Sequence, residues 1–240
     1  MEQILGRAPV LLLSLASAVV AWYLRTQQLA AGEAGLGMFG WVCVGAVVLF
    51  ALYSFFLRPR KDYGTMETRS KAVMGITMVS AVLMLVGCAG TMLALNQMTD
   101  VLVATGSAVI AICWGIVALD RVRGRRTPVG LYMIAALFFA AELICEFRFW
   151  SRDPEILDYC FDLLALICVM CATFHLGGFC FAQGKRRMTV FFCLCGVFFS
   201  AAALAGSGLN GIGRNGASVL WLFANLLPLL RPVKKARDED

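Results

Sequence analysis

The sequence predicts an all-α protein, a polytopic bundle of transmembrane helices with eight spans. Of the 240 residues, 60% are hydrophobic and only 15% are charged, and the mean hydropathy is +0.80. A soluble domain is closer to half apolar and a quarter charged. The apolar residues also form stretches long enough for the roughly 20 helical residues that a bilayer core requires. Together these observations exclude a disordered chain, a secreted disulfide scaffold and a nucleic-acid-binding protein.

Charged residues mark the limits of the expected spans. Unpaired backbone groups in lipid cost several kcal/mol each, and none of the stretches alternates as the strands of a barrel do, so each is expected to be a helix. In chain order the spans are residues 8–24, 37–57, 72–95, 101–119, 128–147, 156–182, 188–206 and 216–230. They form a single membrane domain over residues 1–240, and we expect no soluble domain.

Each of the first four spans lies between two charged residues: Arg7 and Arg25, Glu33 and Arg58, Lys71 and Asp100, and Asp100 and Asp120. The last four lie between Arg126 and Glu142 (continuing to about Phe147), Asp162 and Lys185, Arg187 and Arg214, and Arg214 and Arg231. The sixth helix is expected to start near Asp153-Pro154-Glu155, which reads as an N-cap, a first-turn proline and a first-turn acid.

Two of the spans are less regular than the others. The first resembles a signal peptide, with small residues at Leu15-Ala16-Ser17-Ala18. Because apolar character continues through Trp22-Tyr23-Leu24, we expect this segment to be retained. The last span has only 15 residues, Gly216 to Leu230. We keep it as a span because an interfacial helix would leave the four basic residues of the following tail outside.

The distribution of basic residues predicts the orientation. Eight spans place 17 of the 21 Lys and Arg residues on one side: Arg7, Arg58, Arg60, Lys61, Arg69, Lys71, Arg121, Arg123, Arg125, Arg126, Lys185, Arg186, Arg187, Arg231, Lys234, Lys235 and Arg237. The other side receives Arg25, Arg148, Arg152 and Arg214. Positively charged loops stay in the cytoplasm, so both termini are expected there.

The basic loops also indicate a tandem 4+4 repeat. Arg7-Ala8-Pro9-Val10 before the first span resembles Arg126-Thr127-Pro128-Val129 before the fifth, and Arg60-Lys61 aligns with Lys185-Arg186. A duplicated four-helix unit would keep its orientation and give a pseudo-twofold axis along the membrane normal, an arrangement found in transporters. The alternative is that any two four-span units of equal orientation share their loop charges.

The hairpin between the fifth and sixth spans carries the candidate site. Glu142 and Glu146 lie four positions apart and share a helix face, as do Asp158 and Asp162 on the next helix. Counted from Pro128, Glu142 lies about 21 Å into its span. A carboxylate at that depth must be paired or hydrated. The four acids are therefore expected to form an outward-facing cation or substrate site, with Arg148 and Arg152 at its rim. The alternative is a structural ion-pair network.

A weaker pattern concerns metal binding. Cys168, Cys171 and His175 lie on one stripe of the sixth span, and thiolates with an imidazole suit zinc or copper. The chain has ten cysteines, so such a spacing arises easily by chance, and in a span cysteine behaves as a small apolar residue. We therefore expect no metal site and no cofactor.

No catalytic motif is specific enough to predict an enzyme. The expected function is a small gradient-driven transporter or permease with an outward-facing acidic site, located in the cytoplasmic membrane. The alternative is a non-transporting accessory subunit, sensor or scaffold whose acids form structural ion pairs. The expected partners are the lipid bilayer and, at the basic cytoplasmic loops, anionic lipid headgroups; nucleic acid is not expected. The sequence leaves a partner subunit or a homo-oligomer open.

Overall fold

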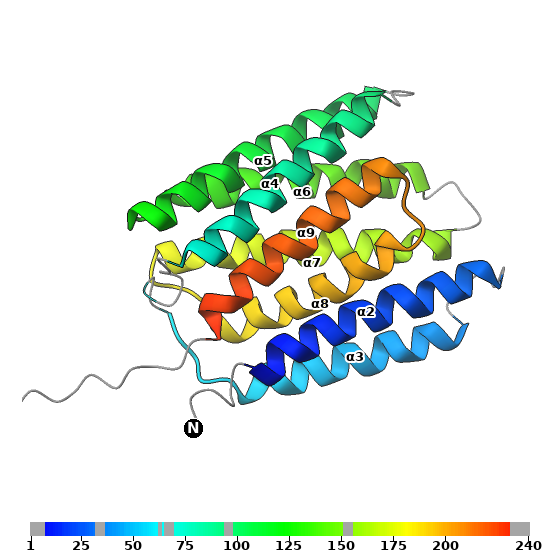
Figure 1. Cartoon of the computed structure of the whole chain (residues 1–240), viewed down its shortest axis with the longest axis horizontal. Helices are drawn as coiled ribbons and strands as arrows, with labels where there is room; N and C mark the ends of the chain where they lie inside the picture. The colour runs from blue at the N-terminus through cyan, green and yellow to red at the C-terminus, as the bar shows by residue number, and fades with distance from the viewer. Residues whose placement is uncertain are drawn as a thin grey trace, which may run out of the picture.

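The computed structural model describes residues 8–31, 37–61, 64, 70–93, 98–150 and 156–230. In these ranges the chain forms eight α-helices (Figure 1): α2 (Ala8–Ala30), α3 (Gly37–Phe56), α4 (Lys71–Leu93), α5 (Met98–Arg123), α6 (Val129–Trp150), α7 (Ile156–Cys180), α8 (Arg186–Leu204) and α9 (Leu209–Leu229). The predicted all-α fold is confirmed for this part of the chain.

Seven of these helices, all except α9, are long and apolar enough to cross a membrane. Their outward faces carry large apolar side chains: on α3, Trp41 and Phe56 are each 80% exposed, and on α2, Leu12 is 64% exposed. Such surfaces would be a liability in water, but they suit contact with hydrocarbon. The helices thus have the length and surface of membrane-spanning helices.

The helix limits differ from the prediction where charged residues were taken as boundaries. Helix α2 continues past Arg25 to Ala30, and α5 continues to Arg123. The largest correction concerns α9, which begins at Leu209 and not at Gly216, so that Arg214 lies inside a helix instead of in a loop. A charged side chain can remain inside a helix when neighbouring helices shield it from lipid, as they do for Arg214.

Six helices form a closed ring. Neighbours in chain order pack together from α4 to α9, and α9 closes the ring against α4. Consecutive helices run in opposite directions, and α2 and α3 lie outside the ring against α8 (Figure 1). The 4+4 repeat is not confirmed: α7 packs closely between α6 and α8, whereas α3, its counterpart in the first half, lies at the edge of the bundle.

Aromatic residues fill the middle of the ring. The indole rings of Trp114 on α5 and Trp221 on α9 stack with centroids 4.5 Å apart and planes 7° apart. Tyr132 and Phe139 of α6 pack against these rings, and all four side chains are almost fully buried. These contacts fix α9 against α5 and α6.

Arginine side chains tie the helices together at the end of the bundle where α9 finishes. Arg186, in the first turn of α8, donates from Nε to the carbonyl of Leu229 at 2.6 Å, satisfying a C-terminal carbonyl of α9. Arg187 donates to the carbonyl of Leu57 at 2.7 Å. Nearby, Arg121 donates to Oδ1 of Asn225 at 2.6 Å. The opposite end, where α5, α7 and α9 begin, carries the candidate site.

Candidate functional site

Three helices of the ring bring charged side chains to one point. Glu142 and Glu146 lie one turn apart on the last part of α6, and Asp162 lies in the second turn of α7. Arg214 and Asn215 lie in the second turn of α9. Helix α6 ends at this end of the ring and α7 and α9 start from it (Figure 1), so these residues lie close enough for their side chains to form ion pairs.

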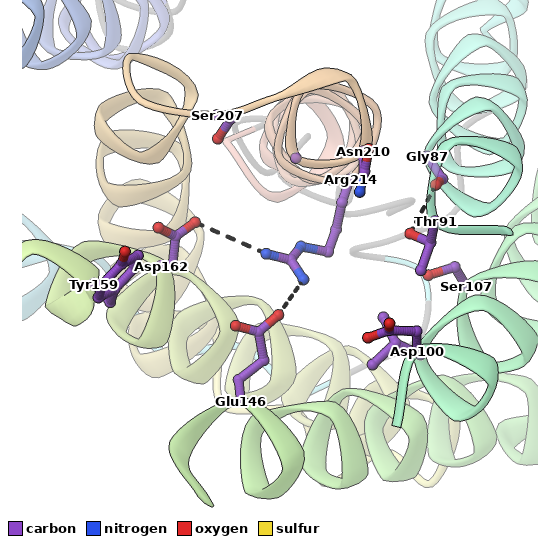
Figure 2. A pocket seen from close by; sticks show the side chains of 12 residues that line it. Gly87, Thr91, Asp100, Ser107, Glu146, Tyr159, Asp162, Ser207, Asn210 and Arg214 are labelled. Carbon is purple, nitrogen blue, oxygen red and sulfur yellow. Dashed lines mark hydrogen bonds and ion pairs between the residues drawn. The ribbon is translucent and has the colours of Figure 1, made fainter. Parts of the chain in front are cut away.

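Arg214 is the centre of this charge cluster, which we define as Arg214, Glu142, Glu146 and Asp162. Its Nη1 lies 2.7 Å from Oε1 of Glu142 and 2.6 Å from Oε1 of Glu146. Its Nη2 lies 3.8 Å from Oδ1 of Asp162 (Figure 2). One guanidinium therefore serves three carboxyl groups, and the cluster carries a formal charge of −2 when all four groups are ionised.

The members of the cluster differ in burial. The side chain of Glu142 is only 4% exposed, whereas those of Glu146 and Asp162 are 18% and 25% exposed. A carboxylate as buried as Glu142 requires its partner, because removing one member of a buried ion pair leaves an uncompensated charge. Glu142 thus holds Arg214 in place, while Glu146 and Asp162 remain accessible from the cavity described below.

Asp162 is held by α9 through a second contact. The amide of Asn215, a buried residue, donates to Oδ1 of Asp162 at 3.2 Å and lies 3.4 Å from Oγ of Ser207. Arg214 also faces Oδ1. Among the described residues, no hydrogen bond reaches Oδ2 of Asp162, so this oxygen can accept one from another partner.

Close contact between α4 and α9 sets the position of Arg214. The backbones of Gly87 and Gly213 touch: a Cβ on Gly213 would overlap the backbone nitrogen and Cα of Gly87, and one on Gly87 would lie 2.9 Å from the backbone nitrogen of Arg214. Small residues that let two helices approach in this way are common in membrane bundles. Here they bring the backbone of Arg214 against α4, so that its side chain extends across the ring.

A polar cavity of about 250 Å³ lies beside the cluster, inside the end of the ring (Figure 2). All six ring helices, or the loops at their ends, contribute to its wall. The charged residues in the wall are Asp100, Glu146, Asp162 and Arg214, and hydroxyl groups come from Thr91, Ser107, Tyr159 and Ser207. Since a water molecule takes about 30 Å³ of liquid volume, the cavity has room for several waters or a small solute.

The predicted site residues are placed as follows. Glu142, Glu146 and Asp162 meet at Arg214, whereas Arg148 is exposed near the end of α6. Asp158 lies in α7, but its side chain is outside the described part of the chain, as is Arg152 altogether. The side chain of Glu142 is buried against Arg214 and does not line the cavity, whereas those of Glu146 and Asp162 do.

Sequence reasoning missed Arg214, Asn215 and Asp100 as members of the site. Arg214 was placed between two spans because a charged residue was taken to end a span. The length of the last span was a usable signal, since 15 residues are too few to cross a bilayer core. Extending the helix back to Leu209 gives 21 residues and places Arg214 inside it.

The weak metal candidates do not assemble into a site. In the described ranges no group of three or more His, Cys, Asp or Glu residues is arranged to hold a metal ion. His175 stacks on the ring of Phe192, with centroids 5.6 Å apart, and Cys168 is buried. These residues pack within the bundle.

The fold and the site define a class: an all-helical protein with membrane-spanning characteristics and a charged cavity inside a ring of six helices. Comparison with models of protein families, with curated proteins and with solved structures finds no match to this chain.

Proposed function

We propose that the chain is a small gradient-driven transporter of the cytoplasmic membrane, with the cavity beside Arg214 as its solute site. One observation carries the proposal: ionisable side chains at helix interiors line a cavity inside the bundle. Ionisable residues within membrane spans are rare, and they usually mark ion or substrate pathways. Small-molecule sites also occur between the helices of bundles, around a small number of polar groups.

The proposal includes eight crossings with both termini in the cytoplasm. At about 1.5 Å per residue, the 21 residues of α9 reach roughly 31 Å, enough to cross a bilayer core. Its polar residues Asn215, Ser218 and Asn225 are buried in the bundle, so they would not face lipid. The alternating direction of the helices and the 17-to-4 distribution of basic residues support the same topology.

The charge cluster supplies a mechanism for coupling. A proton or a cation that enters the cavity brings the formal charge of the cluster from −2 towards neutrality. It would bind at Glu146 or Asp162, which line the cavity, and compete with Arg214 for their oxygens. Release of Arg214 from α6 or α7 would weaken the contact between these helices and α9. This is the kind of change that could open the ring to the other side.

At the opposite end of the bundle, basic side chains such as Arg58, Arg123 and Arg125 are exposed. We propose that they contact anionic lipid headgroups of the cytoplasmic leaflet, where each Lys or Arg near the surface contributes about 1 kcal/mol. The proposal assigns no catalytic reaction and no nucleic-acid partner to the chain.

The second candidate is a non-transporting accessory subunit or scaffold, in which the ion pairs only hold the ring together. The burial of Glu142 against Arg214 favours it, because this acid does not reach the cavity. The two candidates therefore differ at Glu146 and Asp162, the acids that do.

Proton and cation flux in proteoliposomes tests the proposal. The variants are Glu146→Gln and Asp162→Asn, which remove charge but keep shape and hydrogen-bonding groups, beside Asp120→Asn at the far end of α5 as control. A transporter should lose flux in the first two variants while each keeps a melting temperature near that of the parent. Parent protein that shows no gradient-driven flux of protons, Na⁺ or K⁺ would favour the scaffold.

A further inference from the structure

A second cavity adjoins the first on the other side of α7. It has a volume of about 220 Å³ and lies between α2, α7 and α8, outside the ring. Two residues, Tyr159 and Asp162, line both cavities. Figure 2 shows these two side chains next to each other on α7. The carboxylate of Asp162 therefore stands in a wall common to a space inside the ring and a space outside it.

The two cavities have different chemistry. The first carries three acids and one arginine, together with several hydroxyl groups. The second has apolar side chains on one side, from Leu29, Phe161, Ala202 and Ala203, and the polar groups of Arg25, Tyr159 and Asp162 on the rest of its wall. Its one basic residue, Arg25, is buried; its Nη1 donates to Gln28 at 2.8 Å, and its guanidinium lies 4.9 Å from the ring centre of Phe161. Arg25 thus acts as part of the wall.

We propose that the two cavities form one binding site for an organic ammonium ion with a small apolar substituent. The ammonium group would bind Oδ2 of Asp162, the carboxylate oxygen that accepts no hydrogen bond among the described residues. The apolar substituent would lie between Leu29, Ala202 and Ala203. This inference rests on the proposed function and deepens it, because it names the class of solute.

Charge and size both support a cation of this class. In the two cavities together, the three acids Asp100, Glu146 and Asp162 outnumber the two arginines Arg25 and Arg214, so the site favours a cation over an anion. A metal ion or a proton would leave the second cavity unused, whereas an amine with an alkyl or aryl group uses both. Burial of the apolar substituent away from water favours binding. An amine with an apolar group should therefore bind more tightly than a small one.

Binding to the purified protein in lipid nanodiscs tests the inference. Equilibrium dialysis would measure the Kd of 2-phenylethylammonium, of ethylammonium, which lacks the large substituent, and of 2-phenylethanol, which lacks the charge. We expect 2-phenylethylammonium to bind most tightly and 2-phenylethanol not to compete with it. A hydrogen bond to a charged group contributes about 1.5–3 kcal/mol, so Asp162→Asn should raise the Kd of both amines by roughly tenfold or more.

A second variant separates the two cavities. Leu29 is 39% exposed near the end of α2, so Leu29→Trp should fold while it fills part of the second cavity. This variant should raise the Kd of 2-phenylethylammonium at least several-fold and leave the Kd of ethylammonium unchanged. The control is Leu12→Trp, at an exposed position near the other end of the same helix. The inference would be overturned if 2-phenylethanol bound with the same Kd as 2-phenylethylammonium, or if Leu29→Trp left the Kd of 2-phenylethylammonium unchanged.

The outcomes also separate this inference from the proposed function. If neither amine binds but proton or cation flux depends on Glu146, the inference fails and the transporter proposal stands. If 2-phenylethylammonium binds as described but no solute crosses the membrane, the site stands and the transporter proposal fails.

Discussion

The contact between Gly87 and Gly213 makes a sharp prediction about what holds the site together. A Cβ on Gly213 would overlap backbone atoms of Gly87 and lie 3.0 Å from the carbonyl oxygen of Leu83. None of these atoms belongs to a side chain that could rotate away, so Gly213→Ala must push α9 away from α4. At Gly216, on the same helix, a Cβ would meet nothing within 4 Å. Gly216→Ala is therefore a matched control.

The magnitude follows from the difference between the two variants. Both gain the same helix propensity, about 0.5–1 kcal/mol for glycine to alanine. Overpacking a tight contact typically destabilises by about 1–3 kcal/mol. We expect Gly213→Ala to lie at the upper end of this range, because its neighbours are backbone. With roughly 2–4 °C per kcal/mol for a chain of this size, its melting temperature should be several degrees below that of Gly216→Ala.

Thermal unfolding of the purified variants, followed by tryptophan fluorescence, measures this difference. A double variant adds a test of mechanism. Gly87→Ala alone should also destabilise, since its Cβ would lie 2.9 Å from the backbone nitrogen of Arg214. Once α4 and α9 have moved apart, the second alanine should cost less than it does alone, so the two effects should not be additive. Equal melting temperatures for Gly213→Ala and Gly216→Ala would refute the close approach of α4 and α9.

Two further predictions concern the charge cluster and the topology. Arg214→Gln leaves three carboxyl groups without their cation and should destabilise the protein by about 3–5 kcal/mol. Glu142→Gln should destabilise it less, because Arg214 keeps two other partners. Melting temperatures of the two variants check this order, and a lower melting temperature for Glu142→Gln would contradict it. Alkaline phosphatase is active only on the outer side of the membrane. Fusions after Asp100, Pro154 and Gly208 should therefore be active, and fusions after Lys61, Gly124 and Gly184 should be inactive. Any inversion of this pattern would refute the eight-span topology.

The fold could be predicted from the sequence to the extent that hydropathy determines it. Helices α3, α4, α6, α7 and α8 begin and end within a few residues of the predicted limits, because lipid excludes polar backbone and leaves a helix as the only solution for a long apolar stretch. The packing of the helices was not accessible in the same way. Nothing in the hydropathy pattern says that α9 closes a ring against α4, since that contact depends on the glycines Gly87 and Gly213.

Of the charge cluster, the acidic residues could be predicted from the sequence, but their arginine partner could not. The spacing of Glu142 and Glu146 places both acids on one face of α6, and their depth in an apolar stretch indicated that they need a partner. The partner itself, Arg214, lies 72 and 68 residues away along the chain. No local pattern connects residues that far apart, so the sequence identified the need for a cation and not which arginine supplies it.

Arg214 also explains why α9, alone among the eight described helices, is not apolar enough to be recognised as a membrane span. An arginine raises the free energy of insertion of an isolated helix by about 2.5–3.5 kcal/mol at the helix centre. Arg214 lies in the second turn, where the cost is lower, and the asparagines of α9 add to it. In the folded ring Glu142 and Glu146 lie within 2.7 Å of the guanidinium, and Arg121 bonds to Asn225. The polar residues that reduce the hydropathy of α9 are thus the residues that bind the other helices. In the eight-span topology proposed above, insertion of α9 and assembly of the charge cluster would be one event, because Arg214 of α9 forms part of both the cluster and the cavity wall.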